Sequence, residues 1–427
     1  MDILYLNGKP KERITSMKKK SMLIIVLILT FVVSIFMFNK NHELVDKESL
    51  AVFIDDVKTD SFPSKGTVTF LKADCDNNTN IYWNNDTWGL YATNLNEKTK
   101  CNLYFKTLEN AVTKITNLAS IDTVNMATDD PDNNIRYIGA NPNNYVYFNC
   151  DDYNNQTSDT CELWRIIGVF NNIEKEDGTR ENLIKIVRND SIGQYSWDNK
   201  DTTSGAEHDY GKNDWTTSRL NYLLNSGHDN ETNGGSLYFN ASKGNCYYEF
   251  GNKTVSCDFT LKGLKNDTTR NNIESVVWNL GGISEYSTAI SQKFYNDERN
   301  SEVFSGRLSI WTGKIALIYP SDYGYATSGG GTTDRQTCLK KELYNWYDNS
   351  MSDCINNNYL YNSNIFQYTL SHYNKYSYDI YIIDKNGSVH RSSAGLERTV
   401  KPTLFLKSNI SIGIGDGSST NPYQLNL

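Results

Sequence analysis

The sequence LWRIIGVF at residues 163–170 is followed by LIKIV at residues 183–187, after a polar connection that contains Gly178. Both runs are short, apolar and rich in β-branched or aromatic side chains, which is typical of strands in a buried sheet. Because a glycine-containing connection joins them, the two runs are expected to be consecutive strands. Their spacing indicates where the C-terminal part of the chain builds its sheet.

Further strand signals lie on both sides of this pair. Residues 145–148 precede it, and residues 310–319 and 403–406 follow it. Residues 381–384 and 388–390 flank a Lys-Asn-Gly turn, which predicts a hairpin. The last of these runs, 403–406, is expected to close the sheet.

Two short helices are predicted from different signals. Asp214 is a suitable N-cap, and Leu220, Leu223 and Leu224 follow it at helical spacing. Residues 108–118 also carry apolar side chains at near-helical intervals. Strands and helices together predict the α+β class.

Composition and these signals divide the chain into six segments. Residues 51–106 alternate strand-like runs with turn-rich stretches. The predicted segments are a cytoplasmic basic tail at 1–20, a transmembrane anchor at 21–38, a stalk at 39–50, a small disulfide-stapled β module at 51–106, a helical linker at 107–135 and an ectodomain at 136–427.

The run from Met22 to Phe38 contains seventeen residues without a charge and follows three lysines at 18–20. As a helix it would reach about 25 Å, at the lower end of what crosses a bilayer. The bulky residues that follow lack the small-residue pattern of a cleavage site, so a retained anchor is favoured over a cleaved signal peptide. The predicted localisation is the cell membrane, single-pass, with a cytoplasmic N-terminus and an extracellular ectodomain.

Charge is distributed unevenly along the chain. Residues 1–20 carry six Lys/Arg and two Asp/Glu, so the other residues carry 36 Lys/Arg against 48 Asp/Glu, a net charge of −12. An acidic surface of this kind argues against nucleic acid as a partner.

All eight cysteines lie beyond the apolar run, and their even number fits an oxidising compartment. No Cys-x-x-Cys or His-x-x-x-His spacing points to a zinc site. Because the cysteines form four neighbouring pairs, we expect sequential disulfides, although eight cysteines permit 105 connectivities. The expected pairs are Cys75–Cys101, Cys150–Cys161, Cys246–Cys257 and Cys338–Cys354.

Four motifs follow one another in a recognisable order: LWRII at 163–167, WTTSRL at 215–220, WTGKI at 311–315 and VKPTL at 400–404. This order resembles a family of uncharacterised bacterial extracellular domains. Their pattern looks like a variant of the C-type-lectin-like fold, which is also seen in sulfatase-modifying-factor-like and fibrobacter paralogous surface domains. The resemblance covers residues 136–427.

The resemblance implies architecture more than chemistry. Trp164, Trp215 and Trp311 would be core aromatics, and Pro402 would shape an edge of the last strand pair. This chain has Lys401 where the family pattern often has arginine. The sugar-binding motifs of calcium-dependent lectins are missing from the sequence, so no calcium site is expected.

No catalytic or metal-binding pattern is recognisable. The five histidines lack metal-ligand spacing, and a nucleophile elbow, a His-Glu-x-x-His helix and a phosphate-binding glycine loop are all missing. We therefore predict no catalytic residue, no metal and no cofactor. Whether the chain is an enzyme stays open, with a non-enzymatic role favoured.

Binding is the function class that the sequence favours. Two tyrosine clusters lie in turn-rich stretches, and tyrosine offers a large contact area with few rotatable bonds. The alternative is that these rings fill a sheet. The loop 319–331 supplies the candidate ligand-binding residues Tyr319, Asp322, Tyr323 and Tyr325, and the second cluster is Tyr373, Tyr376 and Tyr378.

These observations predict a membrane-anchored, surface-displayed binding or adhesion protein with a disulfide-stabilised ectodomain. Its partner would be an extracellular protein or a glycan, and membrane contact would run through residues 22–38. The alternatives are an extracellular enzyme that acts on envelope material and a structural component of a surface assembly.

Overall fold

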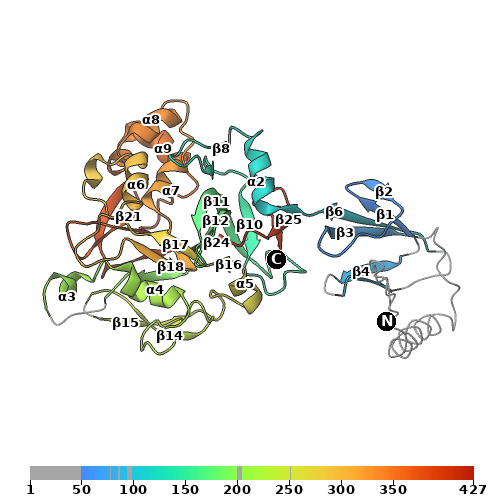
Figure 1. Ribbon diagram of the computed structural model, residues 1–427, viewed down its shortest axis with the longest axis horizontal. Coiled ribbons are helices and arrows are strands. Elements are labelled where there is room, and N and C mark those ends of the chain that lie inside the picture. Colours follow the sequence, from blue (N-terminus) through green and yellow to red (C-terminus); the bar gives the residue numbers. More distant parts are fainter. Residues whose placement is uncertain (1–49, 77, 85–86, 94–98, 200–203, 251) are drawn as a thin grey trace. The chain divides into compact units, whose positions relative to one another are not determined.

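The computed structural model describes residues 50–76, 78–84, 87–93, 99–199, 204–250 and 252–427. The chain divides into two compact units, the first ending at Glu109 and the second running from Asn110 to Leu427. Strands make up 37% of the structure and helices 18%. The protein is therefore sheet-rich (Figure 1).

The first unit is a small β structure. Its strands are β1 (Leu50–Ile54), β2 (Val57–Thr59), β3 (Val68–Cys75), β4 (Asn80–Asn84), β5 (Gly89–Thr93) and β6 (Cys101–Thr107). Four of them form a sheet in the order β2-β1-β6-β3, and β4 pairs with β5. β1 and β6 are parallel, whereas β3 and β6 are antiparallel.

An aromatic core holds the first unit together. The ring of Trp83 lies 4.9 Å from that of Trp88 and 5.2 Å from that of Phe105, measured between centroids. Cys75 and Cys101 face each other on β3 and β6 and form a disulfide. A disulfide therefore joins two neighbouring strands of this small β unit.

The second unit contains most of the secondary structure. Its strands are β8 (Met126–Ala127), β9 (Ile135–Tyr137), β10 (Tyr145–Phe148), β11 (Glu162–Glu174), β12 (Arg180–Arg188), β13 (Gly193–Ser196), β14 (Lys243–Tyr247), β15 (Thr254–Asp258), β16 (Ile273–Glu274), β17 (Val276–Asn279), β18 (Ile310–Gly313), β19 (Ile315–Ala316), β20 (Gln367–His372), β21 (Asp379–Ile383), β22 (Val389–Ser393), β23 (Glu397–Val400), β24 (Thr403–Leu406), β25 (Ser411–Ile414) and β26 (Gln424–Asn426). The short strand β7 (Glu109–Asn110) lies at the boundary between the units.

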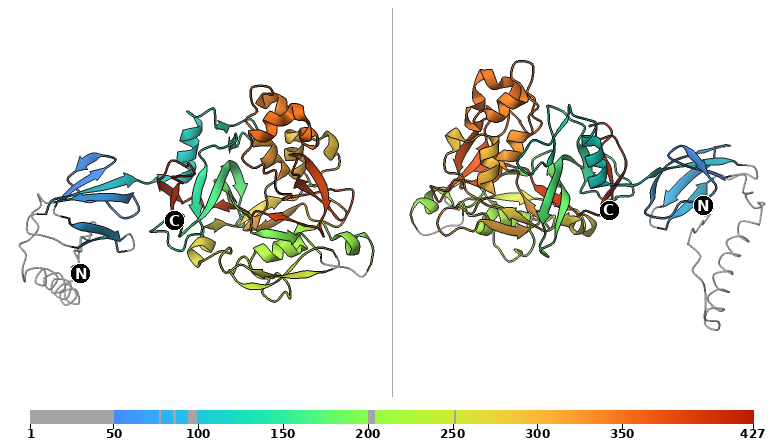
Figure 2. Two further views of the ribbon diagram at one scale, coloured as in Figure 1. Left: turned by 180° about the vertical axis from the view of Figure 1, so that it is seen from behind. Right: turned by 45° about the horizontal axis from the view of Figure 1, so that its top comes forward.

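The helices are short. The α-helices are α2 (Ala111–Ala119), α3 (Ala206–Tyr210), α4 (Arg219–Leu224), α5 (Asp267–Asn271), α6 (Ser291–Glu298), α7 (Pro320–Tyr325), α8 (Arg335–Lys340) and α9 (Ser352–Asn356), and the 3-10 helices are η2 (Trp215–Thr217), η3 (Tyr286–Thr288), η4 (Leu343–Tyr347) and η5 (Asn349–Met351). In both views of Figure 2 the yellow and orange helices gather beside the red strands of the second unit.

The main sheet is built around the apolar runs 163–170 and 183–187, which form β11 and β12. Its order is β16-β24-β12-β11-β9-β8, with β10 also pairing β11 and β19 also pairing β24. β11 and β12 pair antiparallel along most of their length. A Cβ at Gly168 would lie 1.9 Å from the carbonyl oxygen of Ile135. Only glycine therefore allows β9 to approach β11 at this point.

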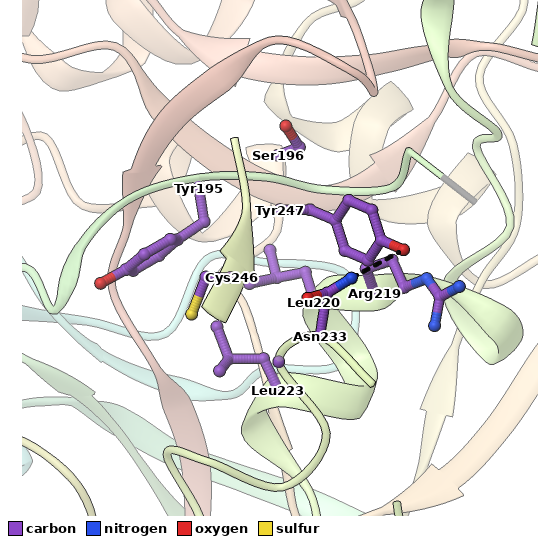
Figure 3. A pocket seen from close by; sticks show the side chains of 9 residues that line it. Tyr195, Ser196, Arg219, Leu220, Leu223, Asn233, Cys246 and Tyr247 are labelled. Atoms are coloured by element: carbon purple, nitrogen blue, oxygen red, sulfur yellow. Dashed lines mark hydrogen bonds between the residues drawn. The ribbon is translucent and has the colours of Figure 1, made fainter. Parts of the chain in front are cut away.

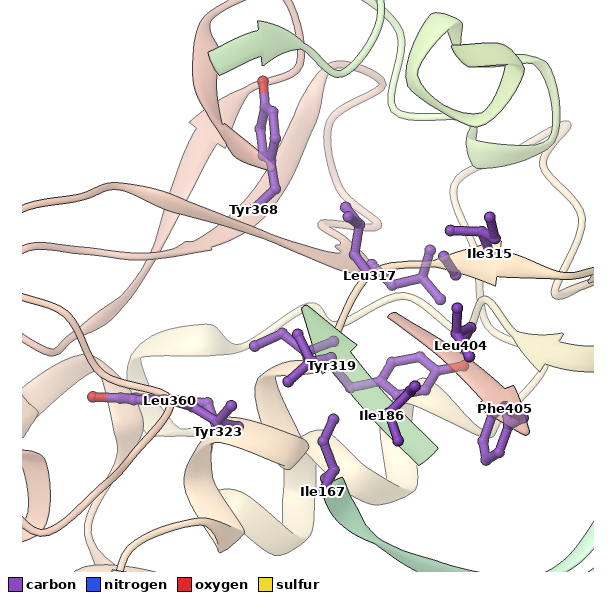
Figure 4. Close-up of a cluster of buried hydrophobic side chains, with 14 of the residues drawn as sticks. Ile167, Ile186, Ile315, Leu317, Tyr319, Tyr323, Leu360, Tyr368, Leu404 and Phe405 are labelled. Carbon is purple, nitrogen blue, oxygen red and sulfur yellow. The ribbon is translucent and has the colours of Figure 1, made fainter. Parts of the chain in front are cut away.

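A second sheet has the order β13-β23-β20-β21-β22. β21 and β22 form the hairpin that the Lys-Asn-Gly turn predicts. The core of the unit lies beside the main sheet. Figure 4 shows part of it, where Ile186 and Leu404 from that sheet meet Tyr319 just ahead of α7.

The α+β prediction, with a transmembrane helix, is wrong for the part of the chain that the structure describes, which is sheet-rich. The longest helix there, α2, has nine residues. Helices of this length do not form by themselves and depend on tertiary packing. Paired strands, not helices, supply most of the framework.

The predicted transmembrane segment 22–38 and the cytoplasmic tail 1–20 lie outside the described residues. Among the described residues no helix is both long and apolar enough to cross a bilayer. The predicted single-pass membrane localisation is therefore withdrawn.

Two further expectations differ from the structure. The helix predicted at 108–118 is present as α2, but its residues Ala111 and Ile115 are buried in the core of the second unit, so the predicted helical linker at 107–135 contributes to that core. The predicted strand 310–319 is split, because β18 pairs with β17 whereas β19 pairs with β24. The chain changes sheets between these two strands, a switch that the uniform apolar run does not reveal.

Candidate functional site

The residues predicted to line a ligand-binding loop lie in the interior. Tyr319 precedes α7, and Asp322, Tyr323 and Tyr325 lie on that helix, all less than 5% exposed. The Tyr323 hydroxyl donates to the carbonyl oxygen of Gly387 at 2.8 Å. These side chains are therefore packed in the core of the second unit. They do not form the exposed loop that the sequence suggests.

Asp322 is the centre of a buried ion network. Its Oδ1 accepts from Arg136 Nη1 at 2.8 Å, and its Oδ2 lies 2.5 Å from Lys185 Nζ. Arg136 also pairs with Asp130 at 2.6 Å. Burial alone would raise the pKa of Asp322, but Lys185 and Arg136 outweigh it and lower the pKa to about 2. Asp322 is therefore ionised in the folded protein.

Lys185 lies among aromatic rings. Its ammonium is 4.4 Å from the ring centroid of Tyr319 and 5.1 Å from that of Phe170. Burial lowers the pKa of Lys185 to about 8, against the opposing effect of Asp322. Lys185 lies near one anion, Asp322, but also near the like charge of Arg136, so its pKa falls. Asp322 lies near two cations, so its pKa falls as well.

Glu298 lies next to this network and is fully buried. Its carboxylate accepts from the backbone N–H of Ser321 at 3.0 Å and pairs with Arg299 at 3.2 Å. Burial raises the pKa of Glu298 to about 7. Because these charges face one another in the interior, we assign the network to the stability of the fold.

A run of aromatic rings that includes the turn between β20 and β21 reaches the surface. Consecutive ring centroids are 5.0 to 6.1 Å apart along the whole run. We call this run the aromatic row. In spatial order its members are Phe250, Tyr210, Tyr378, Tyr376, Tyr373, Tyr286, Tyr344 and Tyr347.

Three members of the aromatic row are strongly exposed: Tyr210 at 44%, Tyr376 at 46% and Tyr347 at 53%. Tyr373, in contrast, is 8% exposed and anchors the middle of the row. Rings that touch each other and still face solvent offer a large contact area to a ligand. Their side chains lose little conformational entropy on binding.

The sequence predicts only part of this row. The second tyrosine cluster of the sequence lies in the turn between β20 and β21, which carries Tyr376 and Tyr378. Tyr210 comes from the end of α3, Tyr286 from η3 and Tyr347 from η4. No sequence spacing links these segments, because tertiary contacts alone bring them together.

Arg391 on β22 packs against the aromatic row. Its guanidinium carbon lies 4.5 Å from the ring centroid of Tyr373 and 5.5 Å from that of Tyr376. Its charge is balanced by Asp379 at 2.9 Å. Lys375, beside the exposed turn, is likewise paired with Glu285. The cations closest to the row are therefore neutralised.

A shallow depression lies between α4 and β14 (Figure 3). Its cavity volume is about 10 Å³, and the residues that line it include Leu220, Leu223 and Tyr247. Asn233 donates to the Tyr247 hydroxyl at 3.4 Å across it. Sites for small organic ligands usually measure roughly 300 to 1,000 Å³, so this depression is too small for one.

The structure joins all eight cysteines in the four sequential pairs expected from their spacing. No thiol among them is available as a nucleophile. Within the described ranges, no group of three or more His, Cys, Asp or Glu side chains is arranged to hold a metal ion.

In sequence, His208 and Asp209 near Trp215 and Asp322 after the strand run 310–319 could form an acid/base pair, but the structure does not bring them together. His208 Nδ1 lies 3.0 Å from Asp209 on the exposed helix α3, whereas Asp322 is buried. No protein-family model, no curated protein and no solved structure matches this chain, so the resemblance to C-type-lectin-like domains stays a prediction.

Proposed function

We propose that the protein is a disulfide-stabilised binding protein and that the aromatic row is its ligand-contacting surface. The observation that carries the proposal is the continuity of the row. Tyr210, Tyr376 and Tyr347 remain 44 to 53% exposed although they belong to one chain of ring contacts.

Charge indicates the kind of ligand. Arg391 and Lys375, the cations that border the row, are each paired with a carboxylate. A charged ligand would therefore have to compete with existing ion pairs, whereas a neutral one would gain ring contact and hydrogen bonds to phenol hydroxyls. An uncharged glycan or an uncharged face of a protein fits this surface.

The four disulfides fit a binding role in an oxidising environment. They join segments that are 11 to 26 residues apart in sequence. Cross-links of this size stabilise a scaffold that presents loops, such as the turn between β20 and β21, in a defined arrangement.

The test is a binding screen of the full chain against immobilised glycans and proteins. The substitutions Tyr376→Ala and Tyr347→Ala are expected to weaken the interaction found for the wild type by roughly tenfold each, the loss typical of an interface tyrosine. The matched control is Tyr82→Ala, because Tyr82 is 64% exposed but belongs to the first unit.

Near-ultraviolet circular dichroism of each variant checks that the ring packing survives. If both variants keep wild-type affinity for every partner found in the screen, the aromatic row is not the binding surface. If the Tyr82 control loses binding as well, the interaction belongs to the first unit.

A further inference from the structure

Two motif residues, Arg165 of the LWRII run and Lys401 of the VKPTL run, are cations for which the described residues supply no ion pair. Arg165 is buried and Lys401 is half-buried, whereas the other buried lysine and arginine residues of the described chain do have such a partner. Arg136 and Lys185 pair with Asp322, and Arg188 pairs with Glu162 at 2.9 Å.

Arg165 is held rigidly although it lacks a counter-ion. It is 6% exposed, and its guanidinium lies 3.7 Å from the ring centroid of Tyr145 and 4.9 Å from that of Tyr359. Its Nε donates to Asn144 Oδ1 at 2.5 Å, and the Asn144 amide donates in turn to the Ile166 carbonyl oxygen at 2.7 Å. This arrangement fixes the plane of the guanidinium.

Strand register places Lys401 beside the main sheet, in the two-residue connection between β23 and β24. Tyr145, Arg165, Val187 and Thr403 pair in turn across β10, β11, β12 and β24, so they form one rung and share a face. Lys401 comes two residues before Thr403. The next residue, Pro402, is hydrogen-bonded to the end of β12, because the backbone N–H of Arg188 donates to the Pro402 carbonyl oxygen at 2.9 Å.

The electrostatics of Lys401 reflect this setting. Burial lowers its pKa to about 8, and repulsion from Arg165 and Arg188 adds to the lowering. Asp190, an exposed carboxylate, acts in the opposite direction. An uncompensated cation in such surroundings costs free energy, which a bound anion would recover.

We propose that Arg165 and Lys401 form a binding site for an oxyanion of the phosphate or carboxylate type. The fixed guanidinium supplies N–H donors in one plane, which matches two oxygens of such a group. The ammonium of Lys401 supplies a second, more adaptable positive charge. The site lies on the main sheet and involves no residue of the aromatic row.

The test measures saturable stabilisation of the full chain by sodium phosphate and by sodium acetate, each against sodium chloride at equal ionic strength. Phosphate or acetate is expected to raise the melting temperature beyond the effect of chloride, and the stronger of the two identifies the ligand class. Lys401→Gln is expected to weaken the binding roughly tenfold or more, the effect of losing a hydrogen bond to a charged group.

Lys340→Gln is the matched control, because Lys340 is an exposed lysine at the end of α8. It should bind like the wild type. Arg165→Lys keeps the charge but removes the planar donors, so it should also bind more weakly. If that variant does not fold, Lys401→Gln alone decides.

A second readout is independent of stability. An anion beside Lys401 would raise the pKa of this lysine, so binding at pH 8.5 should take up protons from the buffer. Calorimetry in two buffers with different ionisation enthalpies measures this uptake. The proposal is overturned if neither anion binds saturably, or if Lys401→Gln binds as the wild type does and takes up the same number of protons.

Discussion

Lys185 Nζ lies 2.5 Å from Asp322 Oδ2, although 137 residues separate the two in sequence and neither side chain is exposed. This contact joins β12 of the main sheet to α7. Because Arg136 on β9 binds the other oxygen of the same carboxylate, one aspartate links three elements of the second unit.

Asp322→Asn should destabilise the protein strongly. It leaves Lys185 without a counter-charge next to Arg136, whose remaining partner is Asp130. Removing one partner of a buried ion pair typically costs roughly 3 to 5 kcal/mol in the free energy of unfolding. Urea denaturation followed by circular dichroism measures the change. Asp74→Asn is the control, because its partner Lys72 lies at the surface and the unfolding midpoint should not move. Equal midpoints for the two variants would contradict the importance of the network.

The pH dependence of stability should show a contribution from Glu298. Burial raises its pKa from 4.5 to about 7 in the folded protein. The folded state therefore holds the proton more tightly, so this contribution is present below pH 4.5 and is lost as the pH rises through 7. Between pH 5 and 7.5 the loss should be on the order of 2 kcal/mol.

Glu298→Gln removes the titrating group but keeps an oxygen that can accept from Ser321. The difference in unfolding free energy between the wild type and this variant should fall steadily from pH 5 to 7.5. A difference that does not change with pH would show that Glu298 is already ionised throughout this range.

Gly168→Ala should disturb the main sheet. The new methyl group would lie 1.9 Å from the Ile135 carbonyl oxygen, so β9 would have to move away from β11. Overpacking of this kind typically costs roughly 1 to 3 kcal/mol. Gly331→Ala is the control, because no atom lies within 4 Å of the added Cβ. Thermal unfolding compares the two, and a wild-type melting temperature for Gly168→Ala would contradict the tight approach.

Removing the Cys75–Cys101 disulfide with a double serine substitution should weaken the first unit. The cross-link spans a sequence separation of 26, and losing it should reduce the stability by about 3 kcal/mol. Hydrogen exchange of amides in β3 and β6 should accelerate accordingly. Amides in β11 serve as the internal reference, because that strand belongs to the second unit. Unchanged protection in β3 would show that the aromatic core around Trp83 stabilises the first unit without the disulfide.

The strands that the sequence predicts best are those with a strong local signal. β10, β11, β12 and β24 lie where the apolar runs place them, and the β21-β22 hairpin forms around its Lys-Asn-Gly turn. A strand of alternating or β-branched residues carries its own pattern. Such patterns do not reveal pairing partners, which is why the split of residues 310–319 between β18 and β19 was not predictable.

The candidate sites were less predictable than the strands. Tyrosines 319, 323 and 325 resemble a surface cluster in sequence but are buried, because α7 packs against the core and not against solvent. Tyr376 does reach the surface, and other members of the aromatic row, such as Tyr210 on α3 and Tyr286 on η3, come from segments far away in the sequence. Sequence spacing cannot report such convergence.

The sequence by itself predicted the sequential disulfides and determined the strand-forming runs, because each depends on signals within a few dozen residues. Only the tertiary structure decided that Asp322 is a buried ion partner, that Arg165 is buried without an ion partner, and that distant tyrosines form one row. The reason is that burial and charge balance depend on which segments meet in space, and apolar runs of similar composition can be paired in many ways.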